Sequence, residues 1–487
     1  MKKVSIDPIT RLEGHGKIEI FLDDKGNVAN AYLQVPELRG FEKFCEGRPV
    51  EEVARITPRI CGVCPEAHHM ASQKTCDAVF HVDPPSAAKK LRELLYSAFY
   101  VADHSTHFYI LAAPDFVVGP TAPPAERNIL GLIAKVGIEA GKTVINARAM
   151  GHEIVGMLGG KIIHPVSGLP GGVAKGLNNE ERDRCIEIGK SLVEFGKFTF
   201  KIFEDVVLKN KAYVDLILSD TFTHKTYYMG LVDKNNKVNF YDGDVRVVDT
   251  TGKEFARFSC ADYLDHIAEH VEPWSYLKFP YLKKVGWKGF VDGQDSGVYR
   301  AAPLARLNVS EGMSTPLAQE EYEKMYSTLG GKPVHQTLAT HWARIIEIMN
   351  AAEIVLKLAE DPEITSTDIR TIPKETPTEG VGVVEAPRGI LFHHYKTDEK
   401  GIVEKANLIV GTTNNYAPIC MSIKKAAQGL ITAGTKITEG VLNQVEMAFR
   451  AYDPCLGCAT HDLSGKLPLE VRIYDSKREL VDVLKTA

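Results

Sequence analysis

The sequence predicts an α+β fold with a mainly helical centre and with β-hairpins near the N-terminus and in the middle of the chain. Three observations support this class. Short alternating segments flank glycine-containing turns, and long periodic segments with few breakers occupy the middle. The proportions of hydrophobic (44%) and charged (25%) residues are those of a folded protein and exclude a disordered, collagen-like or coiled-coil chain.

The first hairpin is predicted at residues 17–22 and 28–35, because an alternating strand meets a turn that ends in Gly26 and a second apolar segment follows. Further strands are expected in the middle of the chain, where Asp-Gly and Thr-Gly pairs mark turns. These strands are 237–240, 244–248 and 254–258.

Helices are expected wherever apolar residues recur at helical spacing over long segments. The predicted helical segments are 86–111, 124–157, 179–208, 337–360 and 418–451. Pro454 is expected to end the last of them. Residues 159–176 and 372–378 are rich in breakers and predict loops, and no clear linker divides the chain.

Charge and hydropathy exclude two classes of partner. The chain of 487 residues carries 58 Lys and Arg against 63 Asp and Glu, a formal net charge of −5, which argues against a nucleic-acid partner. It has no apolar run of about 18 residues, so no membrane span is expected. The N-terminus also lacks the apolar core of a signal peptide, although export on the signal of a partner stays open.

Nine cysteines are too few, and odd in number, for a disulfide scaffold. Four of them form two C-x-x-C pairs, Cys61 with Cys64 and Cys455 with Cys458, separated by most of the chain. Four thiolates are a soft ligand set that suits zinc, an iron–sulfur cluster or nickel. His68 follows Cys64 by four residues, so on a helix the two side chains lie on the same face. His68 could then form a hydrogen bond with a metal-bound sulfur without being a metal ligand itself.

The cysteines alone leave several interpretations open. A structural Cys₄ zinc site is the simplest of them. A thioredoxin-type redox pair is disfavoured, because neither pair lies in a βαβ context. Since the pairs stand near opposite ends of the chain, the site they form is expected to be a buried centre around which the fold is organised.

The residues around the pairs carry a resemblance. The patterns R-x-C-G-x-C-x-x-x-H at 59–68 and D-P-C-x-x-C-x-x-H at 453–461 are the two signatures of the large subunit of nickel–iron hydrogenases. Matching stretches in the same order extend the resemblance from about residue 5 to residue 461 and outweigh the zinc interpretation. These stretches are 11–15, 39–42, 103–104, 107–109 and 386–389.

The resemblance implies nickel bound by all four cysteines. Cys64 and Cys458 would bridge to an iron that carries carbon monoxide and cyanide, and Cys61 and Cys455 would be terminal ligands. The implied reaction is the reversible splitting of dihydrogen. No cysteine set is left for an iron–sulfur cluster in this chain, so electrons would leave through an iron–sulfur small subunit.

The resemblance also implies catalytic roles. Glu13 resembles the proton-gate glutamate of the family, next to Cys455, whose thiolate can take a proton from the substrate. Read alone, Glu13 is a surface or capping residue.

Four more residues resemble those that the family places over the metals. Arg388 would supply a buried guanidinium, with Asp103 and Asp453 beside it and Pro387 completing the turn. Without the resemblance, Arg388 would be interpreted as an ordinary ion-paired arginine. Asp103 and Asp453 would be interpreted as members of a buried ion pair or a helix cap.

Two assignments rest on weaker local matches. Thr412 and Thr413 lie where the family uses a hydroxyl to hold a cyanide, but Asn414 stands where many relatives have tryptophan. Either threonine could instead satisfy backbone groups. Glu42 and His461 resemble ligands of a magnesium or iron ion near the C-terminus, where a carboxylate, an imidazole and waters suit a hard cation.

The chain continues past His461. In this family a C-terminal peptide is commonly removed after that histidine, so we expect one domain over 1–461 and an extension over 462–487. A maturation endopeptidase would cut between His461 and Asp462.

The implied function is the reversible heterolytic oxidation of dihydrogen. The motifs resemble those of cytoplasmic multi-subunit types, which pass electrons to viologen dyes, heterodisulfide reductase modules, or flavin and NAD modules. This implies a cytoplasmic location. A hydrogen-sensing regulatory subunit usually lacks a cleavable tail, and the quinone-site relative in respiratory complex I lacks the cysteines, so both alternatives are disfavoured.

Overall fold

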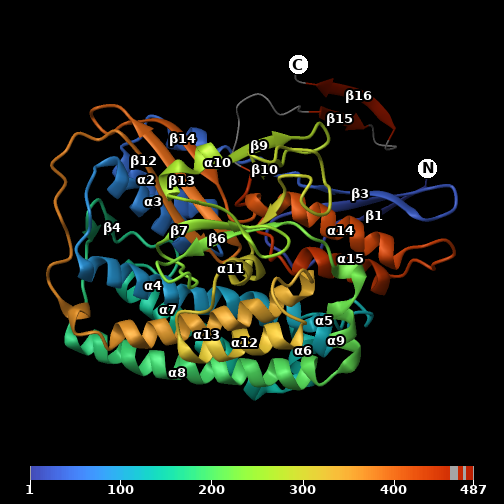
Figure 1. The fold of residues 1–487 in the computed structure, drawn as a ribbon, viewed down its shortest axis with the longest axis horizontal. Helices are drawn as coiled ribbons and strands as arrows, with labels where there is room; N and C mark the ends of the chain where they lie inside the picture. The colour runs from blue at the N-terminus through green and yellow to red at the C-terminus, as the bar shows by residue number, and fades with distance from the viewer. Residues whose placement is uncertain (1, 461–469, 475–478, 486–487) are drawn as a thin grey trace.

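The computed structural model describes residues 2–460, 470–474 and 479–485. Figure 1 shows a layer of long, roughly parallel helices on one side and several small sheets on the other. The N-terminal sheet and the last two long helices close one end of the molecule. This arrangement is the expected α+β class with a helical centre. Among the described residues, no helix is long and apolar enough to cross a membrane.

The helical layer is built around α13 (Thr340–Ala359), which is buried along most of its length. It packs on α8 (Asn179–Phe203) and on α4 (Ser86–Ser105), and α7 (Ile138–Gly159) covers α4. A capping box between Asn178 and Glu181 begins α8, since each side chain bonds to the backbone of the other residue.

The predicted segment 124–157 is two helices rather than one. Gly137, at φ 90°, separates α6 (Ile129–Val136) from α7. A backbone with positive φ favours glycine, so this break has a local cause that the apolar periodicity hides.

A π-helix over Thr106–Ala112 continues α4. Such turns, with their i→i+5 bonds, are frequent at functional sites. The last turn of α4 and the π-helix carry Asp103, His104 and His107, all buried.

The N-terminal sheet has the order β1-β2-β3 and is antiparallel, with β1 over Lys2–Ile6, β2 over Lys17–Leu22 and β3 over Val28–Gln34. The predicted hairpin is therefore confirmed. Ile20 pairs with Val4 and Ala31, and all of the apolar side chains Ile18, Ile20 and Leu33 are buried.

The mid-chain sheet has the order β11-β6-β7-β8. The strands predicted at 244–248 and 254–258 are present as β7 (Asp244–Val248) and β8 (Glu254–Phe258). The strand predicted at 237–240 is wrong: β6 (Tyr227–Val232) pairs with β7 instead. Asn239 accepts hydrogen bonds from the amides of Tyr241 and Asp242, which closes a turn where that strand was expected.

A second meander consists of β12 (Glu379–Ala386), β13 (Gly389–Thr397) and β14 (Val403–Ile409). Ala386 pairs with Gly389, so Pro387 and Arg388 form the two-residue turn between β12 and β13. Gly389 has a φ of 140°, which a residue with a side chain rarely adopts.

The predicted helix 418–451 is also two helices, α14 (Tyr416–Leu430) and α15 (Glu439–Arg450). Gly434, at φ 84°, lies in the break, and the Thr438 side chain caps α15 by accepting a bond from the amide of Val441. The second helix ends at Arg450, before Pro454.

The other elements are short. They are α1 (Phe41–Cys45), α2 (Val50–Ile56), α3 (Pro65–Val79), α5 (Ala113–Val117), α9 (Lys211–Leu218), α10 (Tyr263–His266), α11 (Pro303–Val309), α12 (Pro316–Thr328), β4 (Gly168–Leu169), β5 (Gly172–Val173), β9 (Ile267–Val271), β10 (Lys278–Leu282), β11 (Tyr299–Arg300), β15 (Glu470–Tyr474) and β16 (Leu480–Lys485). The strands β15 and β16 pair with each other and lie at the edge of the molecule (Figure 1).

A buried ion network joins the helical layer to the β12–β13 turn. Arg306 donates to both oxygens of Glu347, at 2.6 and 2.7 Å, and to Glu385 at 3.0 Å. It also donates to the carbonyls of Ala386 and Pro387, at 2.9 and 3.1 Å. The network therefore fixes the backbone on which Arg388 is placed.

Replacing Glu347 by glutamine is expected to lower the free energy of unfolding by about 3–5 kcal/mol, because it leaves Arg306 buried with an incomplete partner. Burial raises the pKa of Glu347, but Arg306 and His104 outweigh it and bring the pKa to about 2. The stabilisation is thus complete above the unfolded pKa, about 4.3, and is lost as the pH falls towards 2.

Differential scanning calorimetry checks this prediction. Glu139→Gln serves as the control, since its ion pair with Lys142 is exposed and is expected to contribute less than about 0.5 kcal/mol. Equal unfolding temperatures for the two variants would contradict the role given to the network.

Candidate metal centre

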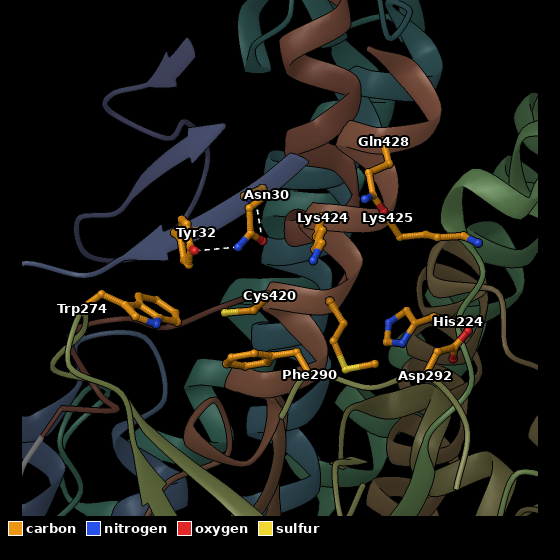
Figure 2. A pocket seen from close by; sticks show the side chains of 12 residues that line it. Asn30, Tyr32, His224, Trp274, Phe290, Asp292, Cys420, Lys424, Lys425 and Gln428 are labelled. Atoms are coloured by element: carbon orange, nitrogen blue, oxygen red, sulfur yellow. Dashed lines mark hydrogen bonds between the residues drawn. The ribbon is translucent and has the colours of Figure 1, made fainter. Parts of the chain in front are cut away.

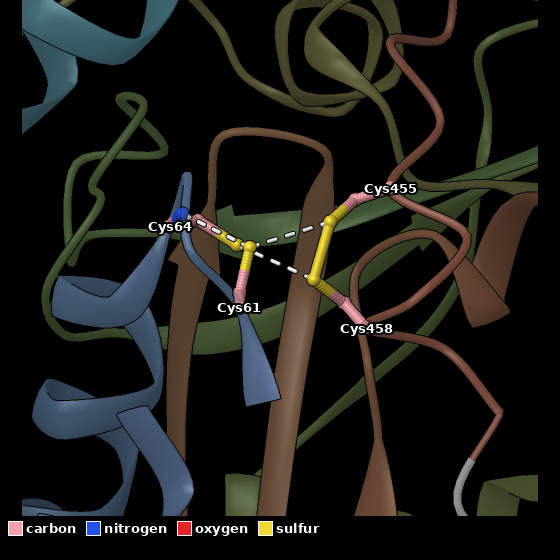
Figure 3. A group of neighbouring side chains, drawn as sticks. All are labelled: Cys61, Cys64, Cys455 and Cys458. Atoms are coloured by element: carbon pink, nitrogen blue, oxygen red, sulfur yellow. Dashed lines mark hydrogen bonds between the residues drawn. A yellow bond between two sulfur atoms is a disulfide. The ribbon is translucent and has the colours of Figure 1, made fainter. Parts of the chain in front are cut away.

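Four cysteine side chains meet in the interior of the protein. The Sγ atoms of Cys61, Cys64, Cys455 and Cys458 all lie within 4.8 Å of one another, and all four residues are buried. Cys61 Sγ is 3.4 Å from Cys455 Sγ, and Cys64 Sγ is 3.9 Å from Cys458 Sγ. Figure 3 shows the sulfurs of the two pairs pointing toward one another from two separate segments.

Local structure explains how each pair presents its sulfurs. Cys61 follows a short 3₁₀-helix, Thr57–Ile60, and Cys64 is the residue before the proline that begins α3. The amides of Val63 and Cys64 donate to Cys61 Sγ, at 3.2 and 3.1 Å. Both of these backbone N–H groups are thus directed at the Cys61 sulfur.

The second pair lies in a tight turn after α15. Cys455 and Cys458 are joined by a disulfide in this structure, with their Cα atoms 5.5 Å apart (Figure 3). A metal is bound by thiolates, so metal binding requires this bond to be reduced. In the reduced protein the four soft donors, brought together away from water, fit a thiophilic metal such as nickel.

Arg39 ties the two cysteine segments together. Its Nη1 atom donates to the carbonyl of Ile60 at 2.5 Å and to that of Gly457 at 3.1 Å. Its backbone amide also donates to the carbonyl of Thr460 at 2.8 Å. One residue thus holds the backbone beside both pairs, a role that was not predicted although Arg39 stands in a matched stretch.

Arg388 is buried beside the cysteines between two carboxylates. Its Nη1 lies 3.0 Å from Asp103 Oδ2 and its Nη2 lies 2.9 Å from Asp453 Oδ2, while Nε donates to the carbonyl of Asp453 at 2.9 Å. Burial lowers the pKa of Arg388, but Asp103 and Asp453 outweigh it and raise the pKa above its usual value, with Cys64 and Cys61 adding to the effect. The structure therefore places a fixed cation within the field of the sulfurs.

The two carboxylates have unequal surroundings. Asp453 adopts φ 57°, a left-handed conformation that turns the chain from α15 into the second cysteine pair. Burial raises its pKa to about 6 although Arg388 and Arg344 oppose the shift. Asp103 uses Oδ2 for Arg388, and its Oδ1 has no partner among the described residues.

Glu13 lies against Cys455. Its Oε2 is 3.0 Å from Cys455 Sγ and accepts a bond from the amide of Gly457 at 3.1 Å. Its carbonyl accepts from the amide of Leu456 at 3.1 Å, so a short parallel bridge fixes the segment. Burial raises the pKa of Glu13, and the Gly457 amide opposes that shift. A carboxylate in contact with one of the sulfurs can exchange a proton with it.

The remaining predicted residues near the cysteines contact other groups. Thr412 accepts a hydrogen bond from the amide of Cys455 at 3.0 Å, and Thr413 donates to the carbonyl of Ala459 at 3.2 Å. His68 lies on α3 with its Nδ1 3.2 Å from Nε2 of His393. The predicted roles of these residues toward a cyanide or a sulfur stay predictions.

Glu42 lies in the first turn of α1 and accepts a hydrogen bond from the amide of Leu408 at 2.8 Å. Its predicted co-ligand His461 lies outside the described residues, as do 462–469 of the predicted extension. The second metal site is therefore a prediction, and so is the division of the chain at 461.

Glu66 was not predicted from the sequence, because no motif indicated a role for it. It is 1% exposed at the start of α3, and both of its carboxylate oxygens have no partner among the described residues. Burial raises the pKa of Glu66 well above its usual value, and the charges of Asp103 and Cys61 add to this. The position after a Cys-Pro pair gave no signal that the side chain would be buried.

Two surface hollows lie away from the cysteines and meet at Trp274. The first has a volume of about 340 Å³ and is shown in Figure 2, where aromatic side chains and two lysines of α14 surround it. The second, about 790 Å³, is lined among others by Asp7, His15 and Lys17.

Comparisons with known proteins point to one family. The family described as Nickel-dependent hydrogenase matches residues 39–128 and 143–461, and a family described as HoxL-like matches residues 3–38. The chain is 54% identical to an iron–sulfur subunit of the F420-non-reducing hydrogenase of Archaeoglobus profundus, over all of both chains. It is 39% identical to the beta chain of the NAD-reducing hydrogenase HoxS of Cupriavidus necator, over 99% of both.

A solved structure agrees with these matches. The crystal structure of an NAD⁺-reducing [NiFe]-hydrogenase in the H₂-reduced state superposes with a TM-score of 0.86 and 37% identity, and covers 95% of this chain and all of that one.

Proposed function

Because the chain belongs to the nickel-dependent hydrogenase family, as the large subunit, we propose that it catalyses the reversible heterolytic oxidation of dihydrogen to protons and electrons. The observation that carries this proposal is the contact of Glu13 with Cys455 within the four-sulfur cluster, beneath a buried arginine. Splitting dihydrogen into unlike parts needs a metal and a base beside it.

The four cysteines are the residues that would hold the metals. Nickel would bind all four thiolates, with Cys64 and Cys458 shared with an iron whose other ligands are carbon monoxide and cyanide. When bound, this group supplies the Lewis-acid and redox chemistry of the reaction.

The protein's own residues handle the proton. Cys455 accepts it on Sγ, and Glu13 takes it from there, since Oε2 is 3.0 Å away. Burial raises the pKa of Glu13, which makes its carboxylate a better proton acceptor than an exposed one.

Arg388 holds a positive charge over the reacting region. Its two carboxylate partners fix the guanidinium, so it needs no reorganisation when charge develops below it. Asp103 and Asp453 therefore act mainly by positioning Arg388, and Arg306 and Arg344 hold the carbonyl of Pro387 at the same turn.

Partners follow from the relatives, which are named as parts of larger hydrogenases. We propose that an iron–sulfur small subunit takes the electrons and passes them to flavin, NAD or heterodisulfide reductase modules. A cytoplasmic location and a magnesium or iron ion on Glu42 and His461 are further predictions. The complex I-like alternative is not favoured, because the four-cysteine set is complete. The regulatory alternative is not favoured, because such a subunit usually lacks the extension expected over 462–487.

The function is tested on the purified complex with two assays. We expect hydrogen-dependent reduction of a viologen dye, and formation of HD from D₂ in ordinary water without any electron acceptor. The exchange assay isolates the splitting and proton steps from electron transfer. Absence of both activities from nickel-loaded protein would contradict the proposal.

We also propose that residues 462–487 are removed during maturation. Intact-mass analysis of the chain in active complex is expected to give the mass of a chain that ends at His461, and cells grown without nickel are expected to retain the longer form. A chain of 487 residues in a complex that turns over hydrogen would contradict this prediction.

A further inference from the structure

Glu37 is a carboxylate near the centre to which the mechanism gives no task. Its Oε2 atom is buried and has no hydrogen-bond partner among the described residues. Its Oε1 atom lies 2.7 Å from Nδ1 of His15. A buried oxygen without a partner costs free energy, so its position beside the proposed proton acceptor needs a physical reason.

Glu37 and Glu13 approach the same point above Gly457. A methyl group added to Gly457 would lie 2.9 Å from Glu13 Oε1 and 3.2 Å from Glu37 Oε2. A methyl group added to Gly14 would lie 2.8 Å from Glu37 Oε2. An oxygen of each carboxylate thus lies beside the same glycine, which brings the two acids together at the second cysteine segment.

The charges in this region agree with that closeness. Glu37 is close enough to Glu13 for its negative charge to act on that carboxyl group. Arg39, which holds both cysteine segments, would lie 3.4 Å from the same added methyl group on Gly457. Polar groups therefore border Gly457 on several sides.

His15 connects Glu37 with solvent. Its side chain is 77% exposed and lines the surface cleft of about 790 Å³ together with Lys17, Gln34 and Trp274. An imidazole has two ring nitrogens, so it can take a proton from a carboxyl group on one of them and release a proton to water from the other. The four groups form a sequence from an interior sulfur to the surface: Cys455, Glu13, Glu37 and His15.

We propose that Glu37 and His15 are the proton exit of this hydrogenase, carrying protons from Glu13 to the surface cleft. The proposal rests on the proposed function. The Glu13 O–H bond breaks as Glu37 Oε2 gains the proton. After the carboxyl group turns, the proton passes to Nδ1 of His15, and Nε2 of His15 releases a proton to water. Glu37 returns to its carboxylate form, and no electrons move along this route.

Tyr416 is the other group near Glu13 that is considered as a carrier of the proton. Its hydroxyl is buried without a hydrogen-bond partner among the described residues, and the charges of Glu13 and Glu37 add to burial in raising its pKa. It therefore lies near both carboxylates, but in this structure it has no hydrogen bond that leads onward to the surface.

The experiment uses the purified complex with variants Glu37→Gln and His15→Ala. Glu379→Gln is the matched control, because Glu379 forms a 2.7 Å pair with His394 on β12 and β13, outside the proposed route. Nickel content and the infrared bands of carbon monoxide and cyanide are recorded first and are expected to equal those of the wild type. Dye reduction is then measured in H₂O and in D₂O.

We expect Glu37→Gln to lower the rate about 10²-fold, with the KM for hydrogen unchanged and a larger solvent isotope effect. His15→Ala is expected to be slower than the wild type and to recover when free imidazole is added, whereas Glu37→Gln is not restored, since imidazole does not replace the missing carboxylate. The control is expected to match the wild type.

Two results would overturn the route. One is a Glu37→Gln or His15→Ala complex with wild-type rates and isotope effect. The other is a rate loss in Tyr416→Phe while Glu37→Gln is unaffected. If Glu37→Gln loads no nickel, His15→Ala and its response to imidazole decide the question. A wild-type complex without nickel or hydrogen turnover is a different outcome, which refutes the proposed function itself.

Discussion

Replacing Glu13 by glutamine is expected to slow hydrogen oxidation by about 10²–10⁴-fold while nickel content stays unchanged. Glutamine keeps the shape and can still accept the hydrogen bond of the Gly457 amide, but it cannot take a proton from Cys455. The measurement is dye reduction together with metal analysis of the same preparation. Formation of HD from D₂ is expected to fall in parallel, since the proton no longer leaves the site.

Glu254→Gln is the control for this prediction. Glu254, on β8, forms ion pairs with Arg246 of β7 and Arg257 of β8. Replacing Glu254 therefore removes a carboxylate of the same type from a surface ion pair. A Glu13→Gln complex that retains wild-type turnover would show that the proton leaves Cys455 by another group.

Replacing Cys64 by alanine is expected to abolish nickel binding and all hydrogen turnover. One of the four sulfurs is removed, and Arg388 would then face an incomplete set of thiolates. Cys76→Ala tests whether any buried cysteine of α3 has the same effect. Cys76 lies on α3, the helix that Cys64 precedes, but its thiol donates to the carbonyl of Val50 at 3.2 Å, away from the cluster.

Nickel is quantified by mass spectrometry in both purified variants. We expect Cys76→Ala to retain nickel, with a loss of stability of the order of 1 kcal/mol. Nickel in equimolar amount with the Cys64→Ala chain would contradict the ligand set.

The sequence predicts the centre better than the fold around it. Both cysteine pairs carry a spacing and flanking residues that are specific enough to identify ligands far apart in the chain, and the structure brings all four together. The glycine breaks at Gly137 and Gly434 were missed because helical periodicity continues on both sides of them.

Residues that act through other residues were harder to predict. Arg306 and Glu347 carry ordinary sequence surroundings, and only the fold shows that they hold the turn of Arg388. Glu37 and His15 each stand in or near matched stretches, but the contact between them depends on the pairing of β2 with β3, which brings the flanking residues together. Long-range pairs of this kind leave no periodic signal in a single sequence.

The proposed chemistry depends on a nickel–iron group held by the four cysteines. Infrared spectroscopy of the purified complex, with nickel, iron and zinc analysis of the same sample, is the sharpest test of that group. We predict carbon monoxide and cyanide stretches and nickel in equimolar amount with the chain. Zinc in place of nickel, without those bands in matured protein, would contradict the proposal and leave a structural Cys₄ site with no task for Glu13 or Arg388.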